Sequence, residues 1–429
     1  MRLRSLVVLF FLTLLHASAG QAPDWLAGAI AAAPPGATLR VPAGVHFGPL
    51  VINQPLRLVG EAGAVIDGRS QGHVIEVRAP GVELIGLLVR GSGSNLSFDH
   101  AGVHVEAADV LIQDMTIVDT LHGIYLKKAP RARIVGTVIR GRASEETIDD
   151  PLTRGLRLAS DELCSVELQQ DQRGNGIHIW NCSDHLIERN DIRGTRDGIY
   201  FQFCDNTRIR DNVIAEVRYG LHYMYSDNNV FERNVFTRSA AGAAIMYSNG
   251  ITLSDNQFAA NRSHRAYGLL LHTVENTRIE HNRIEGNTVG VFLENSMSNL
   301  VLSNRVTGNY IGLRLSDSSD DNQVGSNLLR GNVHPVETGG FNQSNHFTHQ
   351  GRGNDWDGAL KLDLTGDGIA DTAHHETDLF GRWRRSFPEI GLLSGSPGER
   401  ALRFVHARVA VPGIPAVKDE RPLVHARLP

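Results

Sequence analysis

Short apolar phrases begin at regularly spaced glycines along most of this chain. Two runs with a 22-residue period, separated by one 26-residue step, comprise Gly176, Gly198, Gly220 and Gly242, then Gly268, Gly290 and Gly312. The first and third residues after each glycine are apolar, as Ile199 and Phe201 are after Gly198. Because successive side chains of a strand point to opposite faces, these two positions are predicted to face inward and the intervening ones outward.

A second strand is expected in each coil, where apolar pairs such as Ile187 and Ile192 flank an asparagine. The asparagines of this series are Asn190, Asn212, Asn234, Asn256, Asn282, Asn304 and Asn327. Stacked asparagines can hydrogen-bond from coil to coil, and asparagine tolerates left-handed backbone. A fixed period of this length indicates a solenoid. The coils leave no room for the helical half of a leucine-rich repeat, so we predict an all-β, right-handed parallel β-helix.

Departures from the period set the expected boundaries. We expect a signal peptide at 1–19, the β-helix over 20–350 with an excursion at 142–173, a turn-rich closing segment at 351–387 and a tail at 388–429. A helix over 24–33 would cover the open N-terminal end of the solenoid, since terminal units need a polar outer face.

The leader predicts an exported protein. Arg2 and Arg4 precede a short apolar stretch and the small-residue cleavage pattern Ala17-Ser18-Ala19. No later apolar run reaches 18 residues, so no transmembrane span is predicted in the mature chain. Loss of the leader shifts the formal net charge from −5 to −7, which argues against nucleic-acid binding.

Soft metal ligands gather on the outward positions of a few coils. Two and four residues after the glycines stand His178, His222, Met224, Met246 and His272. Stacking places equivalent residues about 4.8 Å apart. Thioethers beside imidazoles are ligands suited to Cu(I). The alternative is a groove in which methionines and aromatic rings simply pack under a loop.

Cys182 and Cys204 are also 22 residues apart, at a turn position that Ser226 and Ser248 hold in later coils. Neighbouring coils are close enough for a disulfide, although in-register stacking suits its geometry poorly. The other interpretations are two small stacked side chains or a thiol site for copper or sulfur. Three cysteines in an exported chain do not form a disulfide framework.

The segment Asp363–Asp371 resembles a calcium loop, with candidate oxygen ligands Asp363, Asp367 and Asp371 and a glycine at the sixth position. Thr365 and His374 stand where the loop pattern has acidic or amide side chains, and a purely structural turn is the alternative.

Catalytic β-helices that act on polysaccharides need convergent carboxylates on an exposed sheet. The outward rows carry few acids: Glu294 is one, and Asp197 and Asp227 are expected at turns. This scarcity disfavours a polysaccharide-active lyase, hydrolase or epimerase. Such an enzyme, or a carbohydrate-binding module, is the alternative function, and it rests on fold analogy alone.

Several phrases resemble the NosD family, the periplasmic β-helix proteins of nitrous oxide reductase maturation. They are RGNGIHIW at 173–180, RDGIYF at 196–201, RYGLHYMYS at 218–226, AAIMYS at 243–248, GVFLEN at 290–295, GRGNDWDG at 351–358, DLTGDGIAD at 363–371 and KDERPL at 418–423. The resemblance covers nearly the whole mature chain. Asp355 and Thr365 depart from it, since the family usually has Tyr and Asp there.

The resemblance implies an accessory protein and not an enzyme. Its expected partners are an ABC transporter of permease and ATPase, apo nitrous oxide reductase and a copper chaperone. It would help to assemble the reductase's copper–sulfur cluster, handling Cu(I) transiently. Carried onto this chain, the resemblance favours a copper site at His222, Met224 and Met246.

Overall fold

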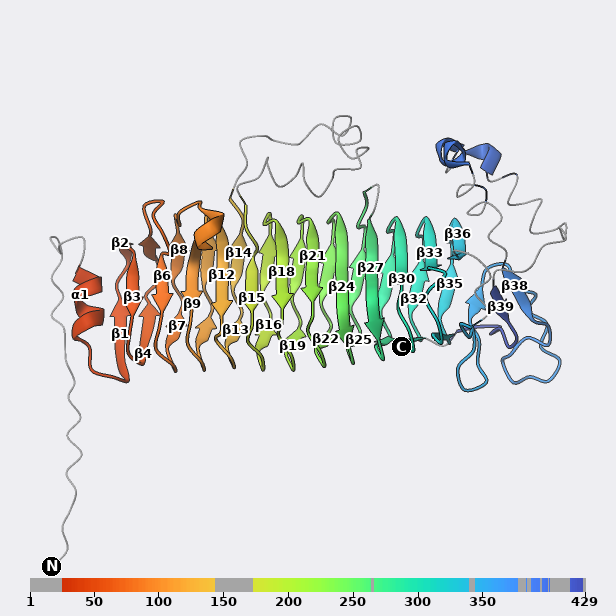
Figure 1. Ribbon diagram of the computed structural model, residues 1–429, viewed down its shortest axis with the longest axis horizontal. Helices are drawn as coiled ribbons and strands as arrows, with labels where there is room; N and C mark the ends of the chain where they lie inside the picture. Colours follow the sequence, from red (N-terminus) through yellow and green to blue (C-terminus); the bar gives the residue numbers. More distant parts are fainter. Residues whose placement is uncertain are drawn as a thin grey trace, which may run out of the picture.

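Figure 1 shows an elongated solenoid in the computed structural model of the chain. The structure describes residues 25–142, 173–263, 266–338, 344–376, 383, 387–393, 396–399, 401 and 417–426. The predicted signal peptide, and the excursion apart from its end residues Arg142 and Arg173, lie outside the described residues.

Three parallel sheets run the length of the solenoid. Sheet A contains β1 (Ala37–Val41), β4 (Leu56–Gly60), β7 (Glu83–Ile85), β10 (Leu111–Gln113), β13 (Arg133–Val135), β16 (Leu186–Glu188), β19 (Arg208–Arg210), β22 (Val230–Glu232), β25 (Thr252–Ser254), β28 (Arg278–Glu280), β31 (Leu300–Leu302) and β34 (Gln323–Gly325).

Sheet B contains β2 (Gly44–Phe47), β5 (Ala64–Asp67), β8 (Leu88–Arg90), β11 (Thr116–Val118), β14 (Val138–Arg140), β17 (Asp191–Arg193), β20 (Val213–Ala215), β23 (Val235–Thr237), β26 (Gln257–Ala259), β29 (Arg283–Glu285), β32 (Arg305–Thr307), β35 (Leu328–Arg330) and β37 (Asp355–Trp356). Sheet C contains β3 (Leu50–Ile52), β6 (Ile75–Val77), β9 (Ala101–Val105), β12 (His122–Lys127), β15 (Ile177–Trp180), β18 (Asp197–Gln202), β21 (Tyr219–Met224), β24 (Ala241–Asn249), β27 (Tyr267–Glu275), β30 (Val289–Glu294), β33 (Ile311–Leu315) and β36 (His334–Thr338).

The right-handed parallel β-helix is therefore confirmed, but each regular coil has three strands where the sequence pattern indicated two. The expected second strand is split at its asparagine: Ile187 lies on β16 of sheet A and Ile192 on β17 of sheet B. Each of these three-residue strands has only one inward apolar residue. Such a pattern cannot distinguish two short strands from one longer strand.

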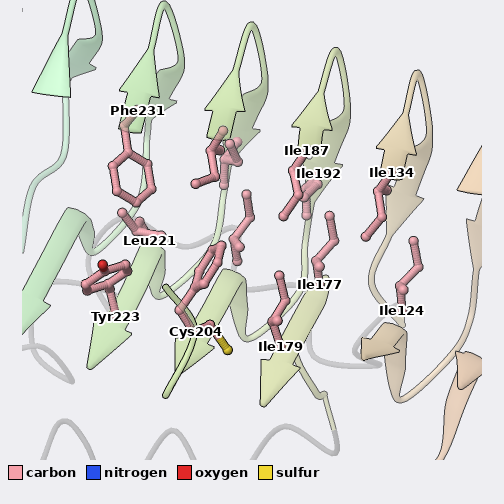
Figure 2. Packing of buried hydrophobic residues seen from close by; sticks show 14 of the residues in the cluster. Ile124, Ile134, Ile177, Ile179, Ile187, Ile192, Cys204, Leu221, Tyr223 and Phe231 are labelled. Atoms are coloured by element: carbon pink, nitrogen blue, oxygen red, sulfur yellow. The ribbon is translucent and has the colours of Figure 1, made fainter. Parts of the chain in front are cut away.

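The inward positions build one continuous core. The predicted pairs, such as Ile177 with Ile179 and Leu221 with Tyr223, are fully buried and line up from coil to coil (Figure 2). The periodic glycines serve this stacking: a Cβ on Gly198 would lie 2.6 Å from the carbonyl oxygen of Gly220 in the next coil. Glycine therefore recurs once per coil because neighbouring coils approach too closely at this position for a side chain.

The predicted asparagine ladder is present between sheets A and B. From Asn190 to Asn327 each side-chain amide donates to the side-chain carbonyl of the next asparagine at 2.9 to 3.0 Å. The left-handed backbone lies one residue earlier than expected, at Arg189 and Asp211 for example, because the asparagine itself must turn its amide inward.

Two more ladders were not predicted. One joins Asn261, Asn287, Asn309 and Asn332 at the corner between sheets B and C. Another joins Asn299, Asn322 and Asn345 at the corner between sheets C and A. Every corner of the later coils is therefore held by buried amide hydrogen bonds, which satisfy polar groups that would otherwise be costly inside the core.

Both ends of the solenoid are covered. Helix α1 (Trp25–Ala32) buries Leu26 and Ile30 against the first coil, as expected. At the other end Asp419, on β39 (Val417–Asp419), accepts hydrogen bonds from the Asn354 amide N–H at 2.7 Å and from Trp356 Nε1 at 2.8 Å. Strand β39 pairs with β38 (His374–Glu376), and the short helices η1 (Leu96–Phe98) and η2 (Pro388–Leu393) complete the described elements.

The excursion does not interrupt the ladder. Strand β12 pairs directly with β15, so Ile124 lies beside Ile177 although 53 residues separate them in sequence. Strand β14 pairs with β17 in the same way. The segment is therefore inserted between β14 and β15 at the corner that leads into sheet C.

Candidate functional site

The candidate site lies on the outer face of sheet C. The strand registers align two outward rows along it. The first row is His104, Tyr125, His178, Tyr200, His222, Ala244, Leu270, Phe292 and Arg314. The second row is Lys127, Trp180, Gln202, Met224, Met246, His272 and Glu294.

The second row brings three predicted ligands together on consecutive coils. Met224 on β21 pairs with Met246 on β24, and Met246 pairs with His272 on β27. His222 is two residues before Met224 and shares its outward face. All four side chains are half-buried. We call His222, Met224, Met246 and His272 the central site.

His222 is oriented by a buried acid. Its Nδ1 lies 3.0 Å from Oδ2 of Asp197, and Arg218 donates to the same carboxylate from Nε at 2.8 Å and from Nη2 at 2.6 Å. An ionised carboxylate can only accept, so Nδ1 of His222 is the donor. The proton is then fixed on Nδ1, and Nε2 is the nitrogen that can bind a metal.

Asp197 was expected at a turn, and this expectation is wrong. The residue lies within β18, immediately before Gly198, and its side chain is 1% exposed. Burial alone would raise the pKa of Asp197, but hydrogen bonds from His222 and Arg218 outweigh it and hold the pKa at about 2. The strict two-residue period gives Asp197 the parity of the inward residues Ile199 and Phe201, so the pattern alone did not place its carboxylate beside His222.

His272 has a similar arrangement. Its Nδ1 lies 2.9 Å from Oε2 of Glu294 on the next coil, and its Nε2 lies 3.3 Å from the Tyr247 hydroxyl. Metal-binding histidines commonly donate their second ring nitrogen to a carboxylate, which fixes the tautomer and the ring direction. Both histidines of the central site therefore have the support that a metal ligand needs.

The central site suits a soft monovalent ion. Within the described ranges, no group of three or more His, Cys, Asp or Glu side chains is arranged to hold a metal. A site here must therefore use the thioethers as ligands. Two thioethers and neutral imidazoles favour Cu(I) over the hard cations, which prefer oxygen.

His178 is not beside the methionines. It is two coils away from His222, with Tyr200 between them, and Asn175 Nδ2 lies 3.1 Å from its Nδ1. His178 belongs instead to a stack of rings on the first row. Successive ring centroids are 4.1 to 5.4 Å apart through His73, His104, Tyr125, His178 and Tyr200.

We call these five rings, with His122, the ring stack. His122 packs edge-on against both Tyr125 and His178. The far end of the stack meets His222, whose ring centroid is 5.0 Å from that of Tyr200. The N-terminal half of the ring stack was not predicted, because the outward row was followed only from Gly176. Gly102 and Gly123 place His104 and Tyr125 in the same row.

Burial sets the charge of the ring stack. It lowers the pKa of His73 and His104 to about 4 and that of His122 and His178 to about 3. Arg196 and neighbouring imidazoles lower the pKa of His122 further, whereas Glu106 opposes the effect of burial at His104. These imidazoles are neutral at pH 7, and the buried Nδ1 atoms of His73 and His104 have no hydrogen-bond partner.

Comparisons with known proteins identify the family. The family model described as "Periplasmic copper-binding protein (NosD)" matches residues 157–360. A Pseudomonas aeruginosa protein named "Probable ABC transporter binding protein NosD" is 36% identical over 398 residues, 89% of this chain and 87% of that protein. A protein of the same name from Stutzerimonas stutzeri is 35% identical over 401 residues, 90% of this chain and 86% of that protein.

This chain belongs to the NosD family. The resemblance read from the sequence is thereby confirmed. The matched segment 157–360 of this NosD chain includes the whole central site. In the part of the chain that the structure describes, no helix is long and apolar enough to cross a membrane.

Solved structures are similar to this NosD chain in fold alone. The A-module of the mannuronan C-5 epimerase AlgE6 of Azotobacter vinelandii is 10% identical, with a TM-score of 0.41 over 76% of this chain and 92% of that chain. A family 28 exopolygalacturonase of Yersinia enterocolitica is 11% identical, with a TM-score of 0.48 over 75% of this chain and 73% of that chain.

The calcium loop of the NosD chain remains a prediction. The Asp363 carboxylate accepts from the backbone N–H groups of Gly366 and Gly368, and these hydrogen bonds lower its pKa. Asp367 and Asp371 each accept a backbone N–H, from Ile369 at 2.9 Å and Leu364 at 2.7 Å. The three carboxylates thus support the turn, which is what its structural interpretation requires.

Proposed function

We propose that this chain is a periplasmic accessory protein that takes up Cu(I) at the central site and helps to assemble the copper–sulfur cluster of nitrous oxide reductase. It acts as a binding and delivery protein and not as an enzyme. The observation that carries the proposal is the consecutive placement of Met224, Met246 and His272, with both histidines of the site oriented by carboxylates.

The chemistry of the site supports transient binding. Thioether and imidazole ligands are neutral, so they hold Cu(I) without the strong charge attraction of thiolates. The four ligands lie on the outer face and are only half-buried, so a partner protein can approach the ion. Release to an acceptor therefore requires no opening of the solenoid.

The proposed partners are an ABC transporter, a copper-donating chaperone and the apo-reductase. Two relatives at 35% and 36% identity are named as ABC transporter binding proteins, which supports the transporter. Export with a cleaved leader would place the chain in the periplasm together with these partners.

A Cu(I) titration of the purified mature protein against a competing chelator, without oxygen, tests the proposal. Replacing Met224 and Met246 together by alanine should remove one bound Cu(I) ion and reduce the copper content of the reductase made in cells carrying the variant. Met297→Ala is the matched control, because Met297 is exposed and lies outside the row. Unchanged stoichiometry in the double variant, with a normal reductase cluster, would refute the copper site.

A further inference from the structure

Sulfur atoms occur on four consecutive coils beside the central site. Cys182 and Cys204 belong to the two coils that precede Met224 and Met246. The whole sequence has only three cysteines and five methionines, so this grouping is unusual. The methionines face outward, whereas the cysteines face the core.

The two cysteines occupy equivalent corner positions. The 22-residue register holds on both sides of them, with Trp180 beside Gln202 and Leu186 beside Arg208. Cys182 is 6% exposed and Cys204 fully buried, directly after the exposed residues Asn181 and Phe203. Figure 2 shows the Cys204 side chain among the core residues around Ile179 and Tyr223. Both thiols are free.

Serine serves a simple purpose at this corner. The Ser226 and Ser248 hydroxyls accept the backbone N–H groups of Cys204 at 2.9 Å and Ser226 at 3.1 Å. A thiol accepts such a hydrogen bond more weakly than a hydroxyl. The fold therefore does not need cysteine here, and two adjacent replacements of serine by cysteine call for another explanation.

The spacing of the two coils suits a metal ion better than a disulfide. Equivalent atoms of stacked strands lie about 4.8 Å apart. A disulfide prefers Cβ atoms about 3.5–4.5 Å apart and a Cβ–S–S–Cβ dihedral near about 90°, which in-register stacking suits poorly. Two metal–thiolate bonds of about 2.3 Å, in line, span about 4.6 Å. Thiolates are also the ligands that Cu(I) prefers.

The surroundings of Cys182 favour its thiolate form, which binds soft cations. A hydrogen bond from the Cys204 thiol lowers the pKa of Cys182, and the His185 imidazole contributes in the same direction against the effect of burial. Burial raises the pKa of Cys204. The buried Nε2 atom of His185 has no other hydrogen-bond partner. Each thiol also donates to a backbone carbonyl oxygen, Cys182 to that of Leu126 at 3.8 Å and Cys204 to that of Gln202 at 3.1 Å.

We propose that Cys182 and Cys204 form a second, two-coordinate Cu(I) site inside the solenoid, one coil away from the central site. Cu(I) binds to both sulfurs in place of the thiol protons, which pass to the solvent, and no electron is transferred. The identity of the metal rests on the proposed function. The geometry of the site, two thiols in register on adjacent coils, does not.

The test uses the mature protein with Cys164 replaced by serine. Its reference form should bind two Cu(I) ions in an oxygen-free titration. Cys182→Ser with Cys204→Ser should bind one, and it should keep the unfolding temperature of the reference because serine already occupies this corner in later coils. Loaded with one ion, the Met224→Ala, Met246→Ala variant should show two short copper–sulfur bonds by X-ray absorption.

Three results would overturn this inference. The serine variant could bind as much copper as the reference form. X-ray absorption of the methionine variant could show nitrogen or oxygen ligands. Mass spectrometry of the exported protein could show Cys182 and Cys204 joined as a disulfide, lighter by two hydrogens. The methionine variant reports on the central site, and therefore on the proposed function. The serine variant reports on the cysteine site, so failures of the two proposals are distinguishable.

Discussion

Histidines lie in two parts of the outer face of sheet C, and their surroundings give them different properties. In the ring stack, His122 is buried and His178 half-buried among the rings, and the loss of hydration keeps both neutral. In the central site, His222 and His272 each face a carboxylate at 3.0 and 2.9 Å. A buried imidazole without an acid beside it contributes packing, whereas one held by an acid presents a defined nitrogen for binding.

The largest expected effect is acid sensitivity of the ring stack. The folded-state pKa values of His122 and His178 are about 3, far below the usual value of about 6.5. The unfolded chain therefore takes up protons first as the pH falls below about 6.5, and stability is lost from there down to the folded-state pKa. At pH 5 each of these two imidazoles costs about 2 kcal/mol relative to pH 7, about 4 kcal/mol together, and His73 and His104 add to the loss.

Urea unfolding at pH 7, 6 and 5 checks this prediction. The midpoint of the wild-type protein should fall at each step, and His122→Gln should reduce the slope by about one proton. Glutamine can still accept the Asn175 backbone N–H that His122 Nδ1 accepts at 3.0 Å. A midpoint independent of pH over this range would show that the stack is not kept neutral by burial.

The second effect is expected from removing Asp197, the carboxylate that His222 has and the ring-stack histidines lack. Asp197→Ala leaves Arg218, whose side chain is 11% exposed, without its carboxylate. Breaking a buried ion pair by removing one partner costs about 3–5 kcal/mol of unfolding free energy. Asp211→Ala is the matched control on the solvent side, where the Arg233 pair is exposed and its loss should cost less than about 1 kcal/mol. Equal losses in the two variants would contradict the account.

The third effect is on affinity alone. Glu294→Gln removes the charge that orients His272, and loss of such a supporting acid lowers metal affinity about 10–100-fold. Stability should change little, since the Glu294 side chain is 38% exposed. A competitive Cu(I) titration measures the affinity, and His104→Gln in the ring stack serves as the control with unchanged affinity. An unaltered affinity in Glu294→Gln would mean that His272 is not a ligand.

Most of the fold could be predicted from the sequence because its period is a direct consequence of stacking. Gly198 must lack a side chain, and Asn212 must meet its equivalents, so both recur at the coil length. The third strand of each coil was missed because three-residue strands carry one inward residue each. The later ladders were missed because Asn261 and Asn299 begin series of only a few members.

The candidate site could be predicted only in part. The outward row gives Met224 and Met246 directly, since the two-residue period and the coil period together fix their positions. The carboxylate partners could not be assigned, because Asp197 reaches His222 across two rows on adjacent coils. Nor does the period report which outward histidine is hydrogen-bonded to a carboxylate, which is what separates His222 from His178.

The most direct test is a comparison of Cu(I) affinity between two double variants, made in a chain whose three cysteines are serine. His222→Gln with His272→Gln should weaken Cu(I) binding at least about 10-fold, because each replacement removes a proposed ligand. His104→Gln with His122→Gln should leave the affinity unchanged. Weak binding in the second variant and normal binding in the first would place the copper in the ring stack and contradict the account.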